Sequence, residues 1–330
     1  MARPWYLLAD IGGTNARFAA AEPDSRLPAL QRVFPVAGHD SFASALDAFM
    51  GELRREGDWN SSPAGACIAV AAPVGSGTIR MTNASWSIDR RACAAQLQLE
   101  AVEVINDFVA QGYAVPALLG ADLRTLHAGE PAPGAACLVL GPGTGLGVCI
   151  GVPTADGWIV LPGEGGHVDL PVTTEEEWSL LRHLAGRYEH VSAERVLSGP
   201  GLQAIYGWLE AREHGAPGEA DSPVSAETIG EAALAGTDSR ARRSVELFLG
   251  LLAAVAGDAA LTAGARGGVY LAGGILPRLW PLLARGDFRE RFIAKGRYRA
   301  YLAAMPLQLV VHPQPGLLGA LQYLRARQGG

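Results

Sequence analysis

The chain has 330 residues, of which 49% are hydrophobic and 18% charged, so it carries enough apolar material for the cores of two domains. Its formal net charge of -6 argues against nucleic acid as a partner. The four cysteines include no C-x-x-C pair, which excludes a cysteine zinc site and a disulfide framework and suits a reducing cytoplasm.

The sequence also argues against a P-loop enzyme, a protein kinase and a membrane protein. The chain has a single lysine, Lys295, which stands in neither a P-loop string nor a protein-kinase strand near the N-terminus. The apolar run 5–9 is too short for a signal peptide, and the run 247–257 falls short of the ~20 residues of a membrane span. We therefore expect a cytoplasmic protein with no membrane contact.

The first hundred residues predict strands that end in polar turns. Apolar runs at 5–9 and 17–21 flank the turn residues 12–15, which predicts a strand–turn–strand unit. A helix is expected from about Ser41, because apolar residues recur on one face. Strands are expected at 66–71 and at 102–105, the second running directly into Asn106 and Asp107.

The opening pattern returns in the middle of the chain. An apolar run at 137–140 precedes a glycine-rich turn at 141–147 and a strand at 148–152. Two such hairpins about 130 residues apart predict two related domains, each presenting a backbone-lined loop to a shared cleft. The alternative is that both are ordinary hairpin turns.

The second half is predicted to be mostly helical. A helix over 174–188 begins with a Thr174/Glu177 capping box and directs Trp178, Leu181 and Leu184 inward. A long helix is expected at 239–263, a strand at 269–272, another at 307–311 and a terminal helix from about Leu317, with a surface loop at 212–224. Strands alternating with helices indicate an α/β fold.

Three glycine turns are candidates for nucleotide binding. In the turn Asp10-Ile11-Gly12-Gly13-Thr14-Asn15, glycine amides can approach phosphate oxygens, and the carboxylate can hold Mg²⁺ through water. The turn Gly143-Thr144-Gly145 could hold the phosphates from the other side, and its spacing is not the dinucleotide fingerprint. The pair Gly273-Gly274 could let an adenosine lie against backbone, although a simple helix-start turn is the alternative.

Polar residues after other strands are candidates for substrate binding and catalysis. Asp107 could accept the proton of an alcohol during phosphoryl transfer, and the alternative is an Asn-Asp turn. Glu164 and His167 on a glycine-rich loop could bind vicinal hydroxyls, whereas a metal site lacks a supporting pattern and a lone histidine is usually structural. The alternative for Glu194 is a solvated helix face, paired with Arg195.

Through these motifs, and over nearly its whole length, the chain resembles the bacterial glucokinase family of the hexokinase–actin-like ATPase superfamily. The stretches at 164–169 and 191–201 are highly specific, whereas the glycine turns are shared by many members of the superfamily. The matching strings are 10–17, 81–83 with Trp86, 105–108, 143–147, 161–169, 190–201, 272–275 and 315–319.

The resemblance implies ATP-dependent phosphorylation of glucose at its 6-hydroxyl, with Asp107 as the base. It implies glucose contacts from Asn106, Asp107, Glu164, His167 and Glu194. It implies Mg-ATP contacts from Asp10, Gly12, Gly13, Thr14, Asn15, Gly143, Thr144 and Gly273. The implied fold is a two-domain, ribonuclease H-like actin-type fold with a cleft that closes on sugar, in a homodimer. We expect a smaller domain at 1–116, rejoined by the helix 313–330, and a larger domain at 117–312.

The chain departs from the family pattern at one position and lacks a motif of a related group. Pro142 departs from the family pattern and removes a backbone donor, so a phosphate contact from that position is not expected. The cysteine-rich zinc motif of a related group of sugar kinases and repressors is missing.

Three alternatives to glucose phosphorylation remain open. They are a kinase of mannose or of an N-acetylated hexosamine, a sugar-sensing repressor and a filament-forming ATPase. A repressor is expected to carry a helix-turn-helix extension before the first strand, and the expected first strand already begins at about Trp5.

Overall fold

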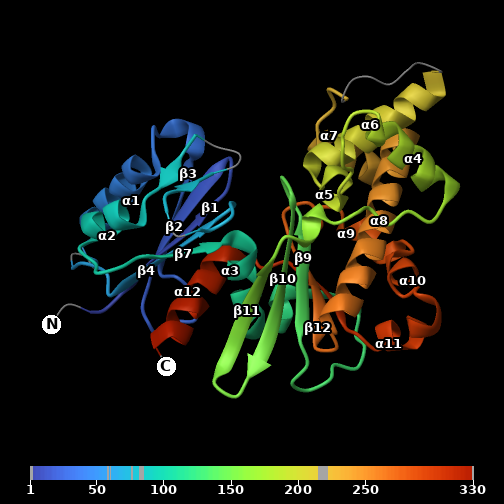
Figure 1. The fold of residues 1–330 in the computed structure, drawn as a ribbon. Coiled ribbons are helices and arrows are strands. Elements are labelled where there is room, and N and C mark those ends of the chain that lie inside the picture. The colour runs from blue at the N-terminus through green and yellow to red at the C-terminus, as the bar shows by residue number, and fades with distance from the viewer. Residues whose placement is uncertain are drawn as a thin grey trace. The chain divides into compact units, whose positions relative to one another are not determined.

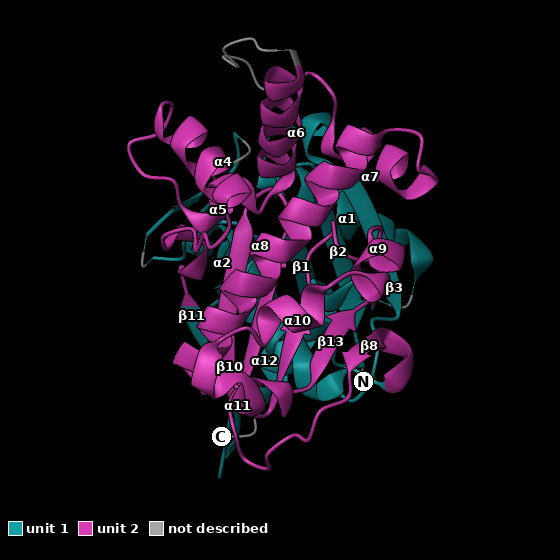
Figure 2. Cartoon of the chain, turned by 90° about the vertical axis from the view of Figure 1, so that its right-hand side faces the viewer, with its two compact units in different colours: residues 1–119, 153–162, 312–330 teal, residues 120–152, 163–311 magenta. Residues whose placement is uncertain are grey.

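The computed structural model describes residues 3–57, 59, 61–75, 77–81, 85–214 and 222–328. Thr82 and Asn83, and residues 215–221 of the expected surface loop, lie outside the described residues. The chain divides into two compact units, which Figure 2 draws in different colours. Unit 1 comprises Met1–Leu119, Pro153–Pro162 and His312–Gly330, and unit 2 comprises Gly120–Val152 and Gly163–Val311.

The strands of unit 1 form a mixed sheet in the order β3-β2-β1-β4-β7. β1 and β2 form the antiparallel hairpin expected from the first glycine turn, whereas β4 and β7 run parallel to β1. The sheet strands are β1 (Tyr6–Ile11), β2 (Asn15–Ala21), β3 (Leu30–Pro35), β4 (Gly65–Val70) and β7 (Glu103–Asn106), with a separate short pair β5 (Ile79–Arg80) and β6 (Ser87–Ile88).

Helices cover both faces of this sheet (Figure 1). Alternate residues of β1, such as Leu7 and Ile11, join the apolar core under α1 (Phe42–Glu56) and α2 (Arg90–Leu97). The opposite face contacts α3 (Asp107–Ala114) and the C-terminal helix α12 (Pro315–Gln328). Because strand side chains alternate between faces, Asp10 belongs to the face of α3 and α12.

Two of these helices confirm expectations from the sequence. The side chain of Ser41 caps α1 by accepting a hydrogen bond from the Ser44 amide, and the expected apolar face is buried. The C-terminal helix α12 packs so closely on α3 that a Cβ at Gly319 would overlap the Ala110 carbonyl. Arg325 also ties α12 to the loop after β2, donating to the Pro23 carbonyl at 2.7 Å.

The second large sheet, most of whose strands belong to unit 2, follows the strand order of the first one and adds a further strand, β8, at its edge. Its order is β11-β10-β9-β12-β13-β8, with β9 and β10 antiparallel and β12 and β13 parallel to β9. The grouping of Pro153–Pro162, which includes most of β11, with unit 1 was not expected from the sequence. The strands are β8 (Leu123–His127), β9 (Cys137–Pro142), β10 (Leu146–Thr154), β11 (Gly157–Gly163), β12 (Gly268–Leu271) and β13 (Leu307–Val310).

The core of unit 2 is built around α8 (Ser239–Ala263), whose bounds match the expected helix. Of the described residues, this helix alone has the length and apolar composition of a membrane span, and 67% of its most apolar window is buried. It packs against α6, α7 and α10, so it is the central core helix of unit 2. Its neighbours are α6 (Gly199–His214), α7 (Ala226–Ala235), α9 (Trp280–Arg285), α10 (Phe288–Phe292) and α11 (Arg299–Ala303).

One expected burial is wrong. Helix α4 (Glu175–Ala185) begins with the predicted capping box, in which Thr174 and Glu177 bond to each other's backbone amides. Trp178, however, is 47% exposed, and the side chain buried beside Leu184 is Leu180. Glu177 is only 5% exposed and pairs with Arg291, so it takes an inward position that a periodicity argument gives to apolar residues.

Candidate active site

The first glycine turn connects β1 to β2 in unit 1. The Gly12 amide donates to the Asn15 carbonyl at 3.0 Å, and the Thr14 carbonyl accepts from the Val36 amide at 2.9 Å. The Gly12 amide is therefore used to close the turn. The amides of Gly13 and Thr14, at the tip of the turn, are then the better candidates for phosphate contact.

Asp10 belongs to β1, and its side chain lies against the start of α12. Its side chain is 20% exposed and 3.9 Å from the Arg17 guanidinium. A Cβ at Gly316 would lie 2.7 Å from the Asp10 carboxyl carbon, so only glycine lets the first turn of α12 approach this closely. Burial raises the pKa of Asp10, and the charge of Arg17 opposes the rise.

Asn106 and Asp107 lie where β7 ends and α3 begins. The Asn106 side-chain oxygen caps α3 by accepting from the Phe108 amide at 2.9 Å and from the Val109 amide at 3.3 Å. Its amide nitrogen lies 3.4 Å from the Ala72 carbonyl, a long hydrogen bond. Asn106 is thus a helix cap that fixes the position of Asp107, the first residue of α3.

The Asp107 carboxyl group is held partly in its acid form. Burial raises the pKa of Asp107 to about 7, and the negative charge of Asp10 adds to the rise. The Phe108 amide, which donates to Asp107 at 3.0 Å, acts in the opposite direction. A carboxylate with a pKa near neutrality is a stronger base than an exposed aspartate and is still ionised in a large fraction of molecules.

Asp10 is the residue predicted to hold a magnesium ion through water. Burial raises the pKa of both Asp10 and Asp107, so a nearby cation would favour their ionised forms. Among the described residues no group of three or more histidine, cysteine and acidic side chains could enclose a metal. A magnesium ion at Asp10 would therefore take most of its ligands from water and phosphate oxygens, which is its usual preference.

The second glycine turn lies between β9 and β10 in unit 2. The Gly143 amide donates to the Gly145 carbonyl at 2.8 Å and so closes the turn, with Thr144 at its tip. At the end of β12, Gly273 has a φ of +81°, and a Cβ there would lie 2.9 Å from the Pro142 carbonyl carbon. Glycine at 273 is thus required by the fold, whereas the Cβ position of Gly274 faces open space.

Glu194 does not occupy a solvated helix face. It lies half-buried in α5 (Ala193–Val196) and accepts a hydrogen bond from the Leu146 amide at 2.9 Å. Arg195 does not pair with it in the described contacts, because its guanidinium stacks 4.3 Å from the centre of the Tyr188 ring. The alternative interpretation of Glu194, as part of a solvated helix face paired with Arg195, is therefore wrong.

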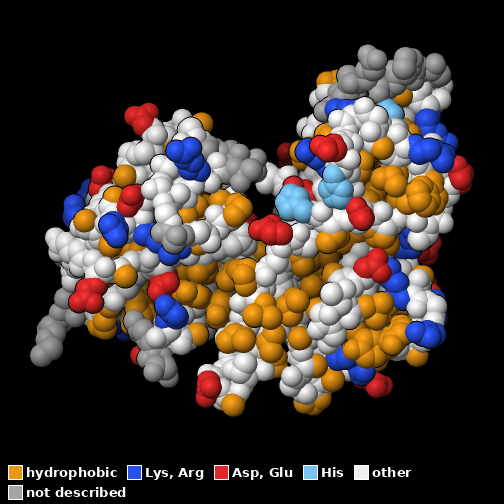
Figure 3. Space-filling view, viewed as in Figure 1, with side chains coloured by type: hydrophobic (Ala, Val, Ile, Leu, Met, Phe, Trp, Pro, Cys, Tyr) orange, Lys and Arg blue, Asp and Glu red, His pale blue; other side chains and the backbone are white. Residues whose placement is uncertain are grey.

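The Glu164–His167 loop lies in the same unit as Glu194. His167 follows Glu164 by one short turn, η4 (Gly165–His167), and their side chains are 4.0 Å apart at Nε2 and Oε2. His190 donates its Nε2 hydrogen to the His167 carbonyl at 3.1 Å. In the space-filling view, histidine side chains lie beside each other near α5, with acidic side chains close by (Figure 3).

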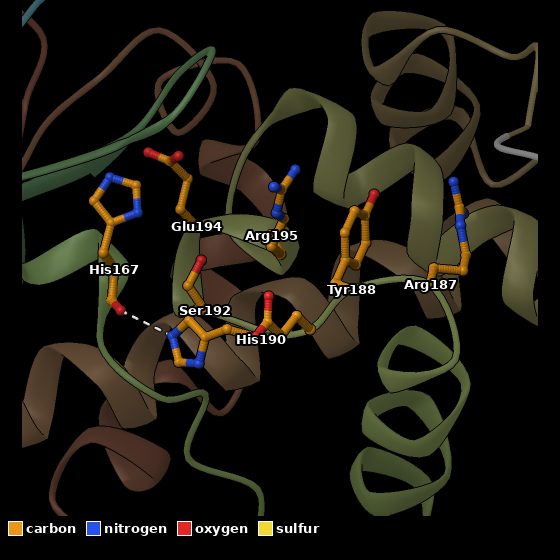
Figure 4. A pocket seen from close by; sticks show the side chains of 8 residues that line it. His167, Arg187, Tyr188, His190, Ser192, Glu194 and Arg195 are labelled. Atoms are coloured by element: carbon orange, nitrogen blue, oxygen red, sulfur yellow. Dashed lines mark hydrogen bonds between the residues drawn. The ribbon is translucent and has the colours of Figure 1, made fainter.

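A cavity of about 410 Å³ brings His167 and Glu194 together. Figure 4 shows these two side chains at one end of the group, with Arg195 and Tyr188 further along. Apart from Arg195, which was considered as a partner of Glu194, the remaining polar residues of the cavity wall were given no role from the sequence, because arginine and histidine on surface segments carry no local signal. Those residues are Arg187, Tyr188, Glu189, His190, Ser192 and Arg195.

The predicted site residues thus form two groups. Asp10, Asn106 and Asp107 gather in unit 1 at the ends of β1 and β7, with the turn 12–15 beside them. Glu164, His167 and Glu194 gather in unit 2, where Glu194 also contacts the residue after the turn 143–145.

Solved sugar kinases share this fold. The ROK hexokinase from Thermus thermophilus matches 98% of this chain and 99% of that chain, with a TM-score of 0.66 at 20% identity. The glucokinase from Balamuthia mandrillaris, solved in complex with glucose, matches 98% and 94% with a TM-score of 0.80 at 23% identity. These likenesses confirm the expected actin-like ATPase fold.

Sequence relationships are more specific than the fold. A glucokinase from an Antarctic psychrotroph covers 97% of this chain and 98% of its own, with a TM-score of 0.82 at 34% identity. The glucokinase of Chromohalobacter salexigens is 44% identical over 98% of both chains, and that of Nitrobacter hamburgensis is 40% identical over 95% of both. The glucokinase family model matches residues 7–327. The chain belongs to the glucokinase family.

Proposed function

We propose that this protein is an ATP-dependent hexose kinase that transfers the γ-phosphoryl group of ATP to the 6-hydroxyl of glucose. Membership of the glucokinase family supports the substrate and the reaction. The observation that carries the mechanism is the Asp107 carboxyl group, held at the start of α3 with a pKa raised to about 7.

Asp107 acts as the general base. The 6-hydroxyl oxygen attacks the γ-phosphorus, the bond from phosphorus to the bridging oxygen breaks, ADP leaves, and the hydroxyl proton passes to Asp107. Phosphoryl transfer needs little from a protein besides positioning, charge compensation and this proton acceptor. A positioned base typically contributes ~10²–10⁴-fold to such a step.

The polar residues of unit 2 bind the sugar. Glu164, His167 and Glu194 offer acceptors and a donor for ring hydroxyl groups, and Asn106 holds Asp107 in place through its capping of α3. Glu164 and His167 are exposed, at 71% and 59% of their side-chain areas, so they are accessible to a ligand. Glu194 keeps one carboxylate oxygen on Leu146 and has the other available for sugar.

The glycine turns bind the nucleotide. The tips of the turns 12–15 and 143–145 supply backbone amides for the phosphates, and Gly274 leaves open space beside β12 for the adenosine. A magnesium ion at Asp10 would neutralise charge on the phosphate oxygens. We further propose that the enzyme works in the cytoplasm as a homodimer and that its product feeds glycolysis.

A coupled assay for sugar 6-phosphate tests the proposal. Purified protein with ATP and Mg²⁺ is given glucose, mannose, fructose or N-acetylglucosamine in parallel, with a reaction lacking Mg²⁺ as control. Turnover that is strongest with glucose and lost without Mg²⁺ supports the proposal. If the folded protein is inactive on glucose but phosphorylates mannose or the hexosamine, that sugar would replace glucose as the proposed substrate.

A further inference from the structure

Leu146, the first residue of β10, contacts both sugar-binding segments of unit 2. Its amide donates to Oε2 of Glu194 at 2.9 Å. On its other side, Gly166 lies so close that an added Cβ would overlap the Leu146 carbonyl oxygen and lie 3.1 Å from the Leu146 Cβ. Leu146 immediately follows the turn 143–145, so the expected phosphate turn and the two sugar segments meet at one residue.

A second hydrogen bond anchors the same turn. The Gly199 amide, at the start of α6, donates to the Gly143 carbonyl at 2.9 Å. The short stretch from Glu194 to Gly199 therefore holds the turn at two points, once through a side chain and once through the backbone. Movement of this stretch would move the turn with it.

Gly145 is the point where an added side chain would displace the Glu194 carboxylate. A Cβ there would lie 3.0 Å from the Glu194 carboxyl carbon and closer still to Oε2. The backbone at Gly145 is not in the positive-φ region, so alanine meets no left-handed backbone penalty there. The three nearest atoms to such a Cβ all belong to Glu194, so we expect its effect on sugar binding to come from contact with that side chain.

We propose that Gly145 is a positioning residue for sugar binding: the absence of its Cβ lets the Glu194 carboxylate bond to Leu146 and present its second oxygen to the substrate. A residue of the phosphate turn thereby sets the position of a sugar-binding carboxylate. This inference rests on the proposed sugar role of Glu194. It implies that a change in the phosphate turn raises the KM for glucose.

Gly143 provides a matched control on the same turn. An added Cβ at Gly143 meets no atom within 4 Å, and its φ is not positive. Gly145→Ala is expected to raise the glucose KM about tenfold, the effect of displacing one hydrogen-bonded charged group. Gly143→Ala is expected to leave the glucose KM within about twofold and to act on the ATP KM alone.

A double-mutant cycle with Glu194→Ala decides whether Gly145 acts through Glu194. In the Glu194→Ala background, Gly145→Ala should change the glucose KM by less than about twofold, because the displaced group is already gone. An equal rise of the glucose KM in both backgrounds, or no rise in the single variant, would overturn the proposal.

Melting temperatures of the same four proteins test the contact independently of activity. Gly145→Ala should lower the melting temperature of the wild-type protein. In the Glu194→Ala background the same substitution should lower the melting temperature much less. If Gly145→Ala fails to fold, the double variant should still fold, and its failure would contradict the proposal. Wild-type turnover of glucose, measured alongside, reports separately on the proposed function.

Discussion

Asp107 and Asp10 are coupled carboxyl groups: burial raises the pKa of Asp107 to about 7, and the negative charge of Asp10 adds to the rise. The two carboxyl groups come from different strands, β1 and β7, and from positions nearly a hundred residues apart in the chain. Asp10 lies against the start of α12, and Asp107 begins α3, so the close packing of these helices keeps both acids in place. The pair therefore links the metal and base functions proposed for unit 1.

The titration of Asp107 should be visible directly. In protein labelled with ¹³C at aspartate carboxyl carbons, the Asp107 signal should titrate with a midpoint near 7. Because a neighbouring negative charge disfavours ionisation, Asp10→Asn should move the Asp107 midpoint to lower pH, and the exposed control Asp40→Asn should not. A wild-type midpoint below about 5 would contradict the raised pKa. The base must be ionised, so kcat/KM for glucose should fall about tenfold per pH unit below the midpoint.

His167 should affect the sugar rather than the nucleotide. Its side chain lines the cavity with Glu194, so His167→Ala should raise the glucose KM by about tenfold through loss of a hydrogen bond, with a much smaller effect on the ATP KM. His183→Ala, on α4 outside the cavity wall, serves as the control. Initial rates with each substrate varied in turn make the comparison, and equal rises in both KM values would argue against a sugar role.

The exposed position of Trp178 has a consequence for stability. Trp178→Ala should lower the free energy of unfolding by no more than about 1 kcal/mol, because nearly half of the side chain is already in water. Leu180→Ala, on the same helix and fully buried, should lower it by about 2–5 kcal/mol. Chemical denaturation of both variants gives the comparison, and a larger loss for Trp178→Ala would mean that its ring is buried in solution.

The contact between α3 and α12 predicts opposite effects for two helical glycines. Gly319→Ala forces a Cβ into the Ala110 backbone and should destabilise the protein by about 1–3 kcal/mol or more. Gly51→Ala, in α1 with open space around its Cβ position, should stabilise it by about 0.5–1 kcal/mol. Melting temperatures measured by calorimetry should therefore move in opposite directions. Equal tolerance of alanine at both positions would show that the helices can separate at little cost.

Local patterns in the sequence predicted much of the fold. The apolar stripe of α8 and the serine cap of α1 are periodic or capping signals contained within one segment, and the structure confirms both. Trp178 was misplaced because Glu177 satisfies its carboxylate with the capping box and with Arg291, more than a hundred residues away. Such a long-range ion pair leaves no trace in the local pattern.

The candidate site, like the fold, could be predicted from the sequence only in part. Asp107 and His167 could be selected from polar residues that follow apolar strands, because that position is a local feature of the sequence. The contacts that give them their chemistry join distant segments. Gly316 with Asp10 and Glu194 with Leu146 are such pairs, and their close approach depends on tertiary packing that no single stretch specifies.

The most direct test of the account is the turnover of Asp107→Ala compared with its affinity for glucose. A general base acts mainly in the transition state, so glucose binding measured by calorimetry should stay within about tenfold of the wild type, while kcat falls by ~10²-fold or more. Asp107→Asn, which keeps the shape of the side chain, should be equally impaired. Near-normal turnover in either folded variant would show that Asp107 is not the base and would contradict the proposed mechanism.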